Sequence, residues 1–131
     1  MKKHGLLQHA LAGTIASMGH TDLVVIADAG LPVPSGVACI DLAVRCGLPS
    51  MLEVTRAVGD ELYVEEVIVA DELLGRDEVL PMTLQEVFPD ARFRSVSHDE
   101  LKRLSTRARA VVRTGECTPY HNVILASGVT F

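Results

Sequence analysis

A histidine and an aspartate flank a short apolar segment, at places where side chains can meet a small polar ligand. His20 follows a glycine and precedes residues 23–27, and Asp28 follows them. An imidazole has an unperturbed pKa of about 6.5, which suits proton transfer near neutral pH. A carboxylate can accept hydrogen bonds from ligand hydroxyls. In the simpler interpretation, His20 is merely solvated and Asp28 caps the following turn.

A second polar cluster lies near the end of the chain, in residues 113–122. If this segment is extended, Tyr120 and Asn122 share one face, because strand side chains alternate. An aromatic ring beside an amide offers a sugar-sized ligand an apolar surface together with hydrogen-bond donors and acceptors. Alternatively, Tyr120 is an ordinary half-buried aromatic residue.

A third cluster begins at Ser97, which has Glu100 three residues later, the spacing of a helix-capping box. His98 and Lys102 are four residues apart, so the predicted helix places both on one face. This face is either part of a binding site or simply a solvated helix surface.

Other familiar sites are not indicated. The five histidines show neither the H-E-x-x-H pattern nor a zinc-ligand spacing, so we expect no metal. Asp28 lacks the second aspartate of a phosphatase-type pair. Residues 13–19 are not a phosphate-binding loop, because no Gly-Lys-Ser/Thr sequence follows them. Three cysteines without C-x-x-C spacing predict neither a disulfide framework nor a zinc pair.

Helical and extended patterns alternate along the chain. This order predicts a single α/β domain, residues 1–131, with a mainly parallel sheet flanked by helices. An unbroken apolar run at 23–27 indicates a strand buried on both faces. Further strands are predicted at 37–42, 63–70, 93–96, 108–112 and 122–126, and helices at 7–18, 50–58, from about 77 to 88 with a disturbance at Pro81, and from 98 onward.

Composition excludes several classes of protein. Apolar residues make up 48% of 131 residues and charged residues 22%, which is typical of a globular domain and not of a disordered chain. The net charge of −5 argues against a nucleic-acid partner. No apolar run reaches the length of a membrane span, and residues 1–9 lack the apolar core of a signal peptide. We therefore expect a cytoplasmic protein without membrane contact.

Taken together, the three clusters resemble the D-ribose pyranase family, sugar mutarotases that include the fucose mutarotases. The resemblance spans the whole chain and is carried by residues 2–5, 19–22, 26–34, 97–98, 113–116, 118–120 and 122. Residues 28–32 resemble the ribose branch of the family. The resemblance implies conversion of ribose between its six-membered pyranose and five-membered furanose forms.

The resemblance also implies roles for individual residues. His20 falls on the proton-donor position of the family. Lys102 is expected to assist. Substrate-binding positions fall on Asp28, His98, Tyr120 and Asn122. The family uses no metal or organic cofactor and forms ring-shaped homo-oligomers, commonly two stacked pentamers, with sites at subunit boundaries. This chain departs from the family at His121, where a small residue is expected.

The chemistry follows independently from what ring exchange requires. The sugar ring must open to the aldehyde, which needs an acid at the ring oxygen and a base at the anomeric hydroxyl. In this hypothesis His20 protonates the ring oxygen, and Asp28 orients a hydroxyl or sets the imidazole tautomer. One alternative is a non-catalytic ribose-binding protein, associated with sugar uptake or regulation, which would not need His20. Another is a structural oligomer, and the mean hydropathy of +0.27 is compatible with subunit association.

Overall fold

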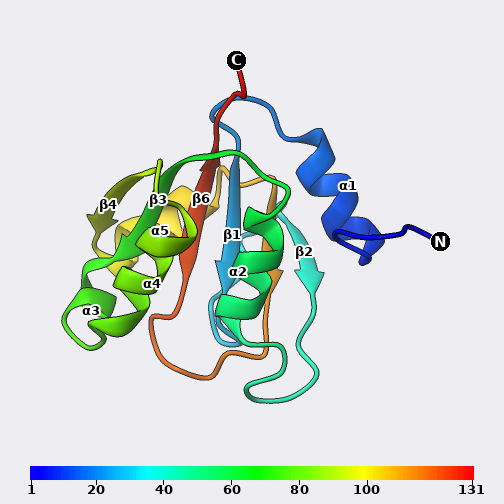
Figure 1. Ribbon diagram of the computed structural model, residues 1–131. Helices are drawn as coiled ribbons and strands as arrows, with labels where there is room; N and C mark the ends of the chain where they lie inside the picture. The colour runs from blue at the N-terminus through cyan, green and yellow to red at the C-terminus, as the bar shows by residue number, and fades with distance from the viewer.

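The computed structural model describes residues 1–131, which form one six-stranded sheet with helices on both faces (Figure 1). The strand order across the sheet is β2-β5-β1-β6-β3-β4. The central strands β1 and β6 are almost entirely buried, as the unbroken apolar sequence of β1 predicts. The strands are β1 (Leu23–Ala27), β2 (Ala38–Asp41), β3 (Val64–Ala70), β4 (Arg92–Val96), β5 (Ala110–Arg113) and β6 (Val123–Ser127).

The predicted α/β fold is confirmed, with one strand reversed. Strands β2, β5 and β1 pair in parallel, as do β3 and β4. The last strand, β6, is antiparallel to both of its neighbours, β1 and β3. It therefore joins two parallel units into one mixed sheet. Residues that precede β1 and residues that follow it lie at opposite ends of this strand.

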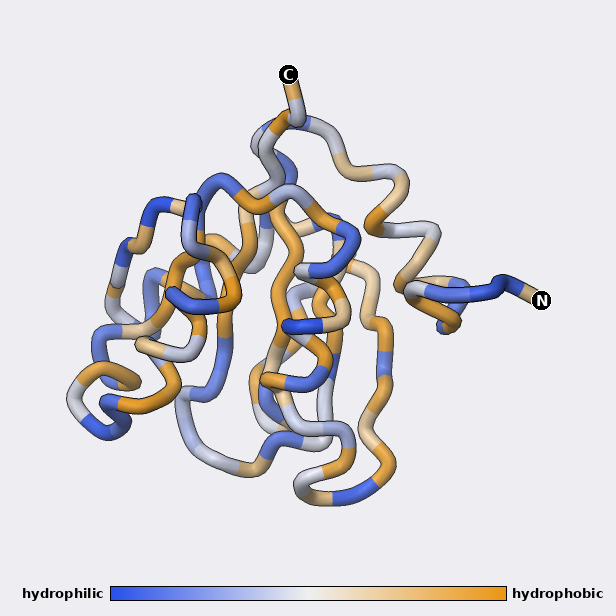
Figure 2. The backbone as a smooth tube through the Cα atoms, viewed as in Figure 1, coloured by the Kyte–Doolittle hydropathy of each residue, from blue (hydrophilic) through white to orange (hydrophobic).

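The helices cover both faces of the sheet. Side chains from α1, α2 and α4 pack on one face in a cluster of 21 buried residues, and α5 covers the other face in a cluster of 8. Figure 2 shows hydrophobic residues concentrated along the central strands. The helices are α1 (His9–Ser17), α2 (Met51–Gly59), α3 (Asp71–Leu74), α4 (Val79–Val87) and α5 (His98–Ser105). None of them is long and apolar enough to cross a membrane.

Side-chain caps fix the starts of four helices, and at α1 the Gln8 side chain accepts from the Leu11 N–H. Ser50 and Glu53 form a reciprocal capping box at α2. The predicted cap at Ser97 is confirmed, because its hydroxyl accepts from the Glu100 N–H, although the Glu100 carboxylate pairs with Arg103 instead of returning to the cap. At α4 the carboxylate of Asp77 accepts from the first two N–H groups. The sequence did not indicate the short helix α3.

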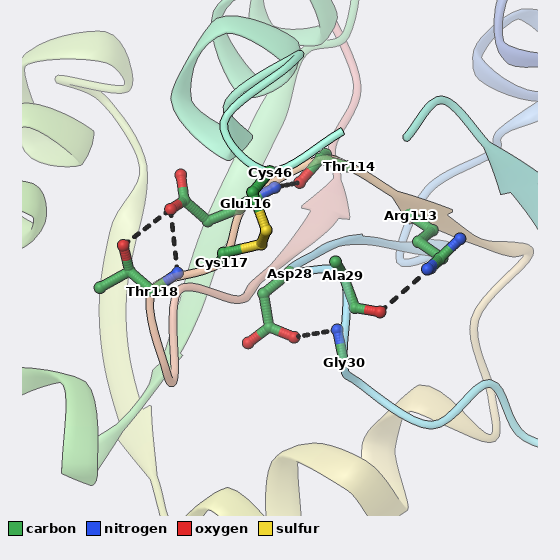
Figure 3. The surroundings of a disulfide bond; sticks show 9 residues. All are labelled: Asp28, Ala29, Gly30, Cys46, Arg113, Thr114, Glu116, Cys117 and Thr118. Atoms are coloured by element: carbon green, nitrogen blue, oxygen red, sulfur yellow. Dashed lines mark hydrogen bonds between the residues drawn. A yellow bond between two sulfur atoms is a disulfide. The ribbon is translucent and has the colours of Figure 1, made fainter. Parts of the chain in front are cut away.

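Two of the three cysteines form a disulfide, so the prediction that they do not is wrong. Cys46 and Cys117 are bonded with Cα atoms 5.5 Å apart, and Cys39 is free. The bond joins the loop before α2 to the loop after β5 (Figure 3). These cysteines are 71 residues apart, and only the parallel placement of β2 and β5 brings their loops together. The spacing of the cysteines in the sequence therefore does not predict this disulfide.

Replacing Cys46 by serine is expected to lower the free energy of unfolding by about 2–4 kcal/mol, because the bond restricts the unfolded chain over a long loop. Urea unfolding of the oxidised protein measures the change. Cys39→Ser, which removes an exposed free thiol, is the matched control and should have little effect. Equal stability of the Cys46→Ser variant and the oxidised protein would contradict the prediction.

Candidate active site

A cavity of about 600 Å³ opens at the edge of the sheet where β1 and β5 end. Parallel strands of α/β sheets commonly place ligand sites at this edge. The size suits a small polar ligand such as a monosaccharide. Three chain segments form its walls, namely residues 28–32 after β1, residues 98 and 102 of α5, and residues 116–120 after β5. The three predicted clusters therefore meet, apart from His20 and Asn122.

Asp28 lies in the wall of the cavity, and its carboxylate is held by two donors. Its Oδ1 accepts from the Gly30 N–H at 3.0 Å, and its Oδ2 accepts from Asn122 Nδ2 at 2.9 Å. The Asp28 N–H in turn donates to Asn122 Oδ1 at 2.8 Å. Asp28 therefore caps a turn, as the simpler interpretation predicts, and the residue also lines the cavity. Asn122 is fully buried and contacts Asp28, and it does not line the cavity.

Tyr120 and His98 form a second wall of the cavity. Their rings meet edge to face, with centroids 5.0 Å apart and planes at 87°. The chain is not extended here, because Tyr120 has φ of +66°. The condition under which Tyr120 and Asn122 would share a strand face is therefore not met. His98 Nδ1 is buried without a hydrogen-bond partner, so a bound hydroxyl could satisfy it.

The helix α5 presents Lys102 to the same cavity, one turn after His98. This confirms that the two side chains share a helix face. Lys102 Nζ lies 3.4 Å from Asp99 Oδ1 in an exposed pair. Such pairs are weak, so the ammonium group remains free to contact a ligand.

The loop after β5 is tied closely to the loop before α2. A Cβ atom on Gly115 would lie 2.4 Å from the carbonyl oxygens of Arg45 and Leu48, so this approach requires glycine. Burial would raise the pKa of Glu116, but hydrogen bonds from Thr118 and the Met51 N–H outweigh it and lower that pKa below its usual value. In Figure 3 the Glu116 carboxylate points to Thr118. Glu116 therefore secures this loop and also lines the cavity.

His20 lies at the opposite end of β1 from the cavity. It precedes β1 whereas Asp28 follows it, and a five-residue strand spans roughly 16 Å. His20 is absent from the cavity wall, and its side chain is 54% exposed. Within one chain, His20 cannot touch a ligand that is bound beside Asp28.

Glu65 holds the imidazole of His20, a contact that the sequence did not indicate. His20 Nε2 lies 3.0 Å from Glu65 Oε2. A carboxylate only accepts hydrogen bonds, so His20 Nε2 donates to Glu65, and Nδ1 has no hydrogen-bond partner within the chain. The following residue, Thr21, has φ of +68°, and its N–H donates to the Ser127 carbonyl, which fixes the turn.

The fold and this cavity together define an α/β protein with a monosaccharide-sized polar site. Comparison with known proteins then identifies the family, because the RbsD / FucU transport protein family matches residues 1–130. The chain belongs to that family. It is 47% identical over 131 residues to the D-ribose pyranase of Bacillus cereus strain G9842, with both chains covered completely.

Solved structures agree with this assignment. Bacillus subtilis RbsD complexed with D-ribose matches with a TM-score of 0.95 and 46% identity, and each chain is covered completely. The fucose mutarotase of Streptococcus pneumoniae in complex with L-fucose matches with a TM-score of 0.81 over 99% of this chain and 100% of that one. Its identity is 23%, so this second likeness concerns the fold alone.

Proposed function

We propose that this protein is a D-ribose pyranase, a mutarotase that interconverts the β-pyranose and β-furanose forms of D-ribose through the open aldehyde. The observation that carries the proposal is the cavity formed by Asp28, His98 and Tyr120 in a chain that matches a ribose-bound relative over its whole length. Opening the ring breaks the bond between the anomeric carbon and the ring oxygen. The ring oxygen gains a proton, and the anomeric hydroxyl loses one as it becomes the aldehyde carbonyl. No oxidation or group transfer is involved, so we expect no metal or organic cofactor. A placed acid–base group contributes typically about 10²–10⁴-fold to such a step.

The polar groups of the cavity have complementary tasks in this proposal. The Asp28 carboxylate accepts from a sugar hydroxyl, and Asn122 acts through Asp28 by holding that carboxylate in place. Tyr120 offers its ring face and hydroxyl, and His98 offers the unpartnered Nδ1. Lys102 assists at the rim of the cavity. These groups bind and orient the sugar, which leaves the proton donor to be supplied.

We infer that His20 of a neighbouring copy supplies this acid. Its distance from the cavity of its own chain and its half-exposed side chain support that inference. Large exposed apolar side chains, among them Leu7 and Met82, support subunit association. A head-to-tail ring would bring the His20 edge of one subunit to the cavity of the next at every interface. We propose a homo-oligomer of two stacked pentameric rings.

Glu65 has a positioning role in this scheme, because it fixes the orientation of the His20 ring. Replacing Glu65 by alanine is expected to lower the rate of ribose ring exchange roughly three- to tenfold through loss of that hydrogen bond. Ribose affinity should change little, because Glu65 orients the His20 ring and is not one of the residues that line the cavity. Exchange rates and calorimetric titration with ribose measure the two effects. A loss of affinity with an unchanged rate would contradict this role.

We further propose that residues 1–131 act as one domain in the cytoplasm, with no nucleic-acid or membrane partner. Cytoplasmic thiols are normally kept reduced, so the disulfide provides a test of this location. Trapping thiols at the moment of cell lysis should give three free cysteines per chain for the cytoplasmic protein. A single free cysteine would contradict the location.

Magnetisation exchange between the anomeric proton signals of D-ribose tests the function directly. We expect the wild-type protein to accelerate pyranose–furanose exchange in a concentration-dependent manner. Ribose binding without acceleration would instead identify a ribose-binding protein. Acceleration for L-fucose alone would place the chain in the other branch of the family.

A further inference from the structure

A contact between a histidine and an aspartate joins the segment that carries Tyr120 to a second loop. His121 Nε2 lies 3.1 Å from Asp77 Oδ2, and the two side chains are only 14% and 27% exposed. His121 belongs to the segment that carries Tyr120, and Asp77 lies between α3 and α4. His121 is not part of the cavity wall. The proposed reaction therefore does not use this pair.

Hydrogen bonds with the backbone hold Asp77 in place. Its Oδ1 accepts from the N–H groups of Val79 at 2.8 Å and Leu80 at 3.1 Å, which caps α4. Its own N–H donates to the Leu73 carbonyl at 2.9 Å. The hydrogen bond from Leu80 is the main cause that lowers the pKa of Asp77 below its usual value. The carboxylate that His121 contacts is therefore ionised at neutral pH and held by the backbone.

The same loop also contacts the ring of Tyr120. The guanidinium of Arg76 lies 5.1 Å from the centroid of that ring, which is within the range of a cation–π contact. His98 meets the ring with its centroid 5.0 Å away. The loop thus contacts two consecutive residues, Tyr120 through Arg76 and His121 through Asp77.

Tyr120 needs such support because of its backbone. Its φ of +66° is in the left-handed region. For a residue with a side chain this conformation costs of order 1–3 kcal/mol, and it persists only where surrounding contacts enforce it. The bond from the Asn122 N–H to the Tyr120 carbonyl, at 2.8 Å, closes the turn on one side. On the other side, the His121 N–H donates to the Thr118 carbonyl at 3.3 Å, and Asp77 holds the His121 imidazole.

We propose that His121 is a positioning residue, which through Asp77 holds Tyr120 in the left-handed conformation that places its ring beside His98 in the cavity. The inference rests on the proposed function of that cavity. His121 then acts on sugar affinity and not on proton transfer. A role in proton transfer fits the geometry poorly, since His121 lies outside the cavity and its Nε2 is engaged by Asp77.

The test compares His121→Ala with His121→Gln, whose amide can still donate to Asp77. We expect the alanine variant to raise KM and the calorimetric Kd for ribose roughly three- to tenfold, with kcat changed less than about twofold. The glutamine variant should recover most of the affinity. His9→Ala, which removes an exposed histidine from α1, is the matched control. An unchanged KM, or a lower kcat at unchanged KM, would overturn the proposal.

A second measurement does not depend on ribose. The chain has two tyrosines and no tryptophan. In a Tyr63→Phe background, Tyr120 is therefore the only residue that gives tyrosine fluorescence. We expect His121→Ala to lower its anisotropy and increase its quenching by acrylamide, and His121→Gln to restore both. Unchanged fluorescence would overturn the positioning role even if ribose were not the substrate. Failure of ribose exchange in the wild type would overturn the proposed function alone.

Discussion

Replacing His20 by alanine is expected to slow ribose ring exchange by about 10²–10⁴-fold, the usual contribution of a placed acid–base group. Ribose affinity should change less than the rate, because Asp28, His98 and Tyr120 still line the cavity that binds the sugar. Exchange spectroscopy measures the rate and calorimetry measures the affinity. His9→Ala is the control, because it removes an exposed histidine of the same chain. A rate unchanged in His20→Ala would move the acid to another residue.

A mixing experiment then tests whether His20 acts on the cavity of another subunit. His20→Ala and Asp28→Asn chains are unfolded together, refolded at equal concentration, and compared with each variant refolded alone. If each site takes His20 from one chain and Asp28 from the next, about one quarter of the sites in a random mixture carry both intact groups. Activity should then reappear at about that fraction of wild type. Mixtures as inactive as the separate variants would contradict a shared site.

Much of the fold could be predicted because it follows from local sequence patterns. The apolar run at 23–27 and the cap at Ser97 both specify their elements through residues close in the chain. The reversal of β6 could not be predicted, because the burial of that strand on both faces is the same in either direction. The disulfide was missed because it depends on the pairing of β2 with β5, which brings together two loops that are 71 residues apart.

The site could be predicted in part. Asp28 was indicated by its place after a buried strand. Helical spacing placed His98 and Lys102 on one face, and the family resemblance assigned that face to the site. All three residues line one cavity. The turn at Tyr120 was missed, because a left-handed tyrosine contradicts ordinary backbone preference. The partner of His20 was missed as well, since Glu65 lies 45 residues away and meets it only across paired strands.

Replacing Asp28 by asparagine is expected to lower ribose exchange about 10- to 100-fold and stability by about 1–3 kcal/mol. Both carboxylate oxygens accept hydrogen bonds, from the Gly30 N–H and from Asn122 Nδ2. An amide has only one acceptor, so one of these donors would face another donor. Exchange spectroscopy and urea unfolding measure the losses. Asp90→Asn, at an exposed aspartate, is the control and should change neither quantity.

A double variant, Asp28→Asn with Asn122→Asp, separates the hydrogen bonds from the charge. A carboxylate at position 122 would still accept from the backbone N–H of residue 28, and its second oxygen would accept from the new amide. The remaining amide oxygen would accept from Gly30, so every donor regains an acceptor. We expect stability to recover while exchange stays slow, because the charge has moved from the cavity wall to a fully buried position. Recovery of both would mean that Asp28 serves only to shape the loop, and the carboxylate would then have no direct part in binding the sugar.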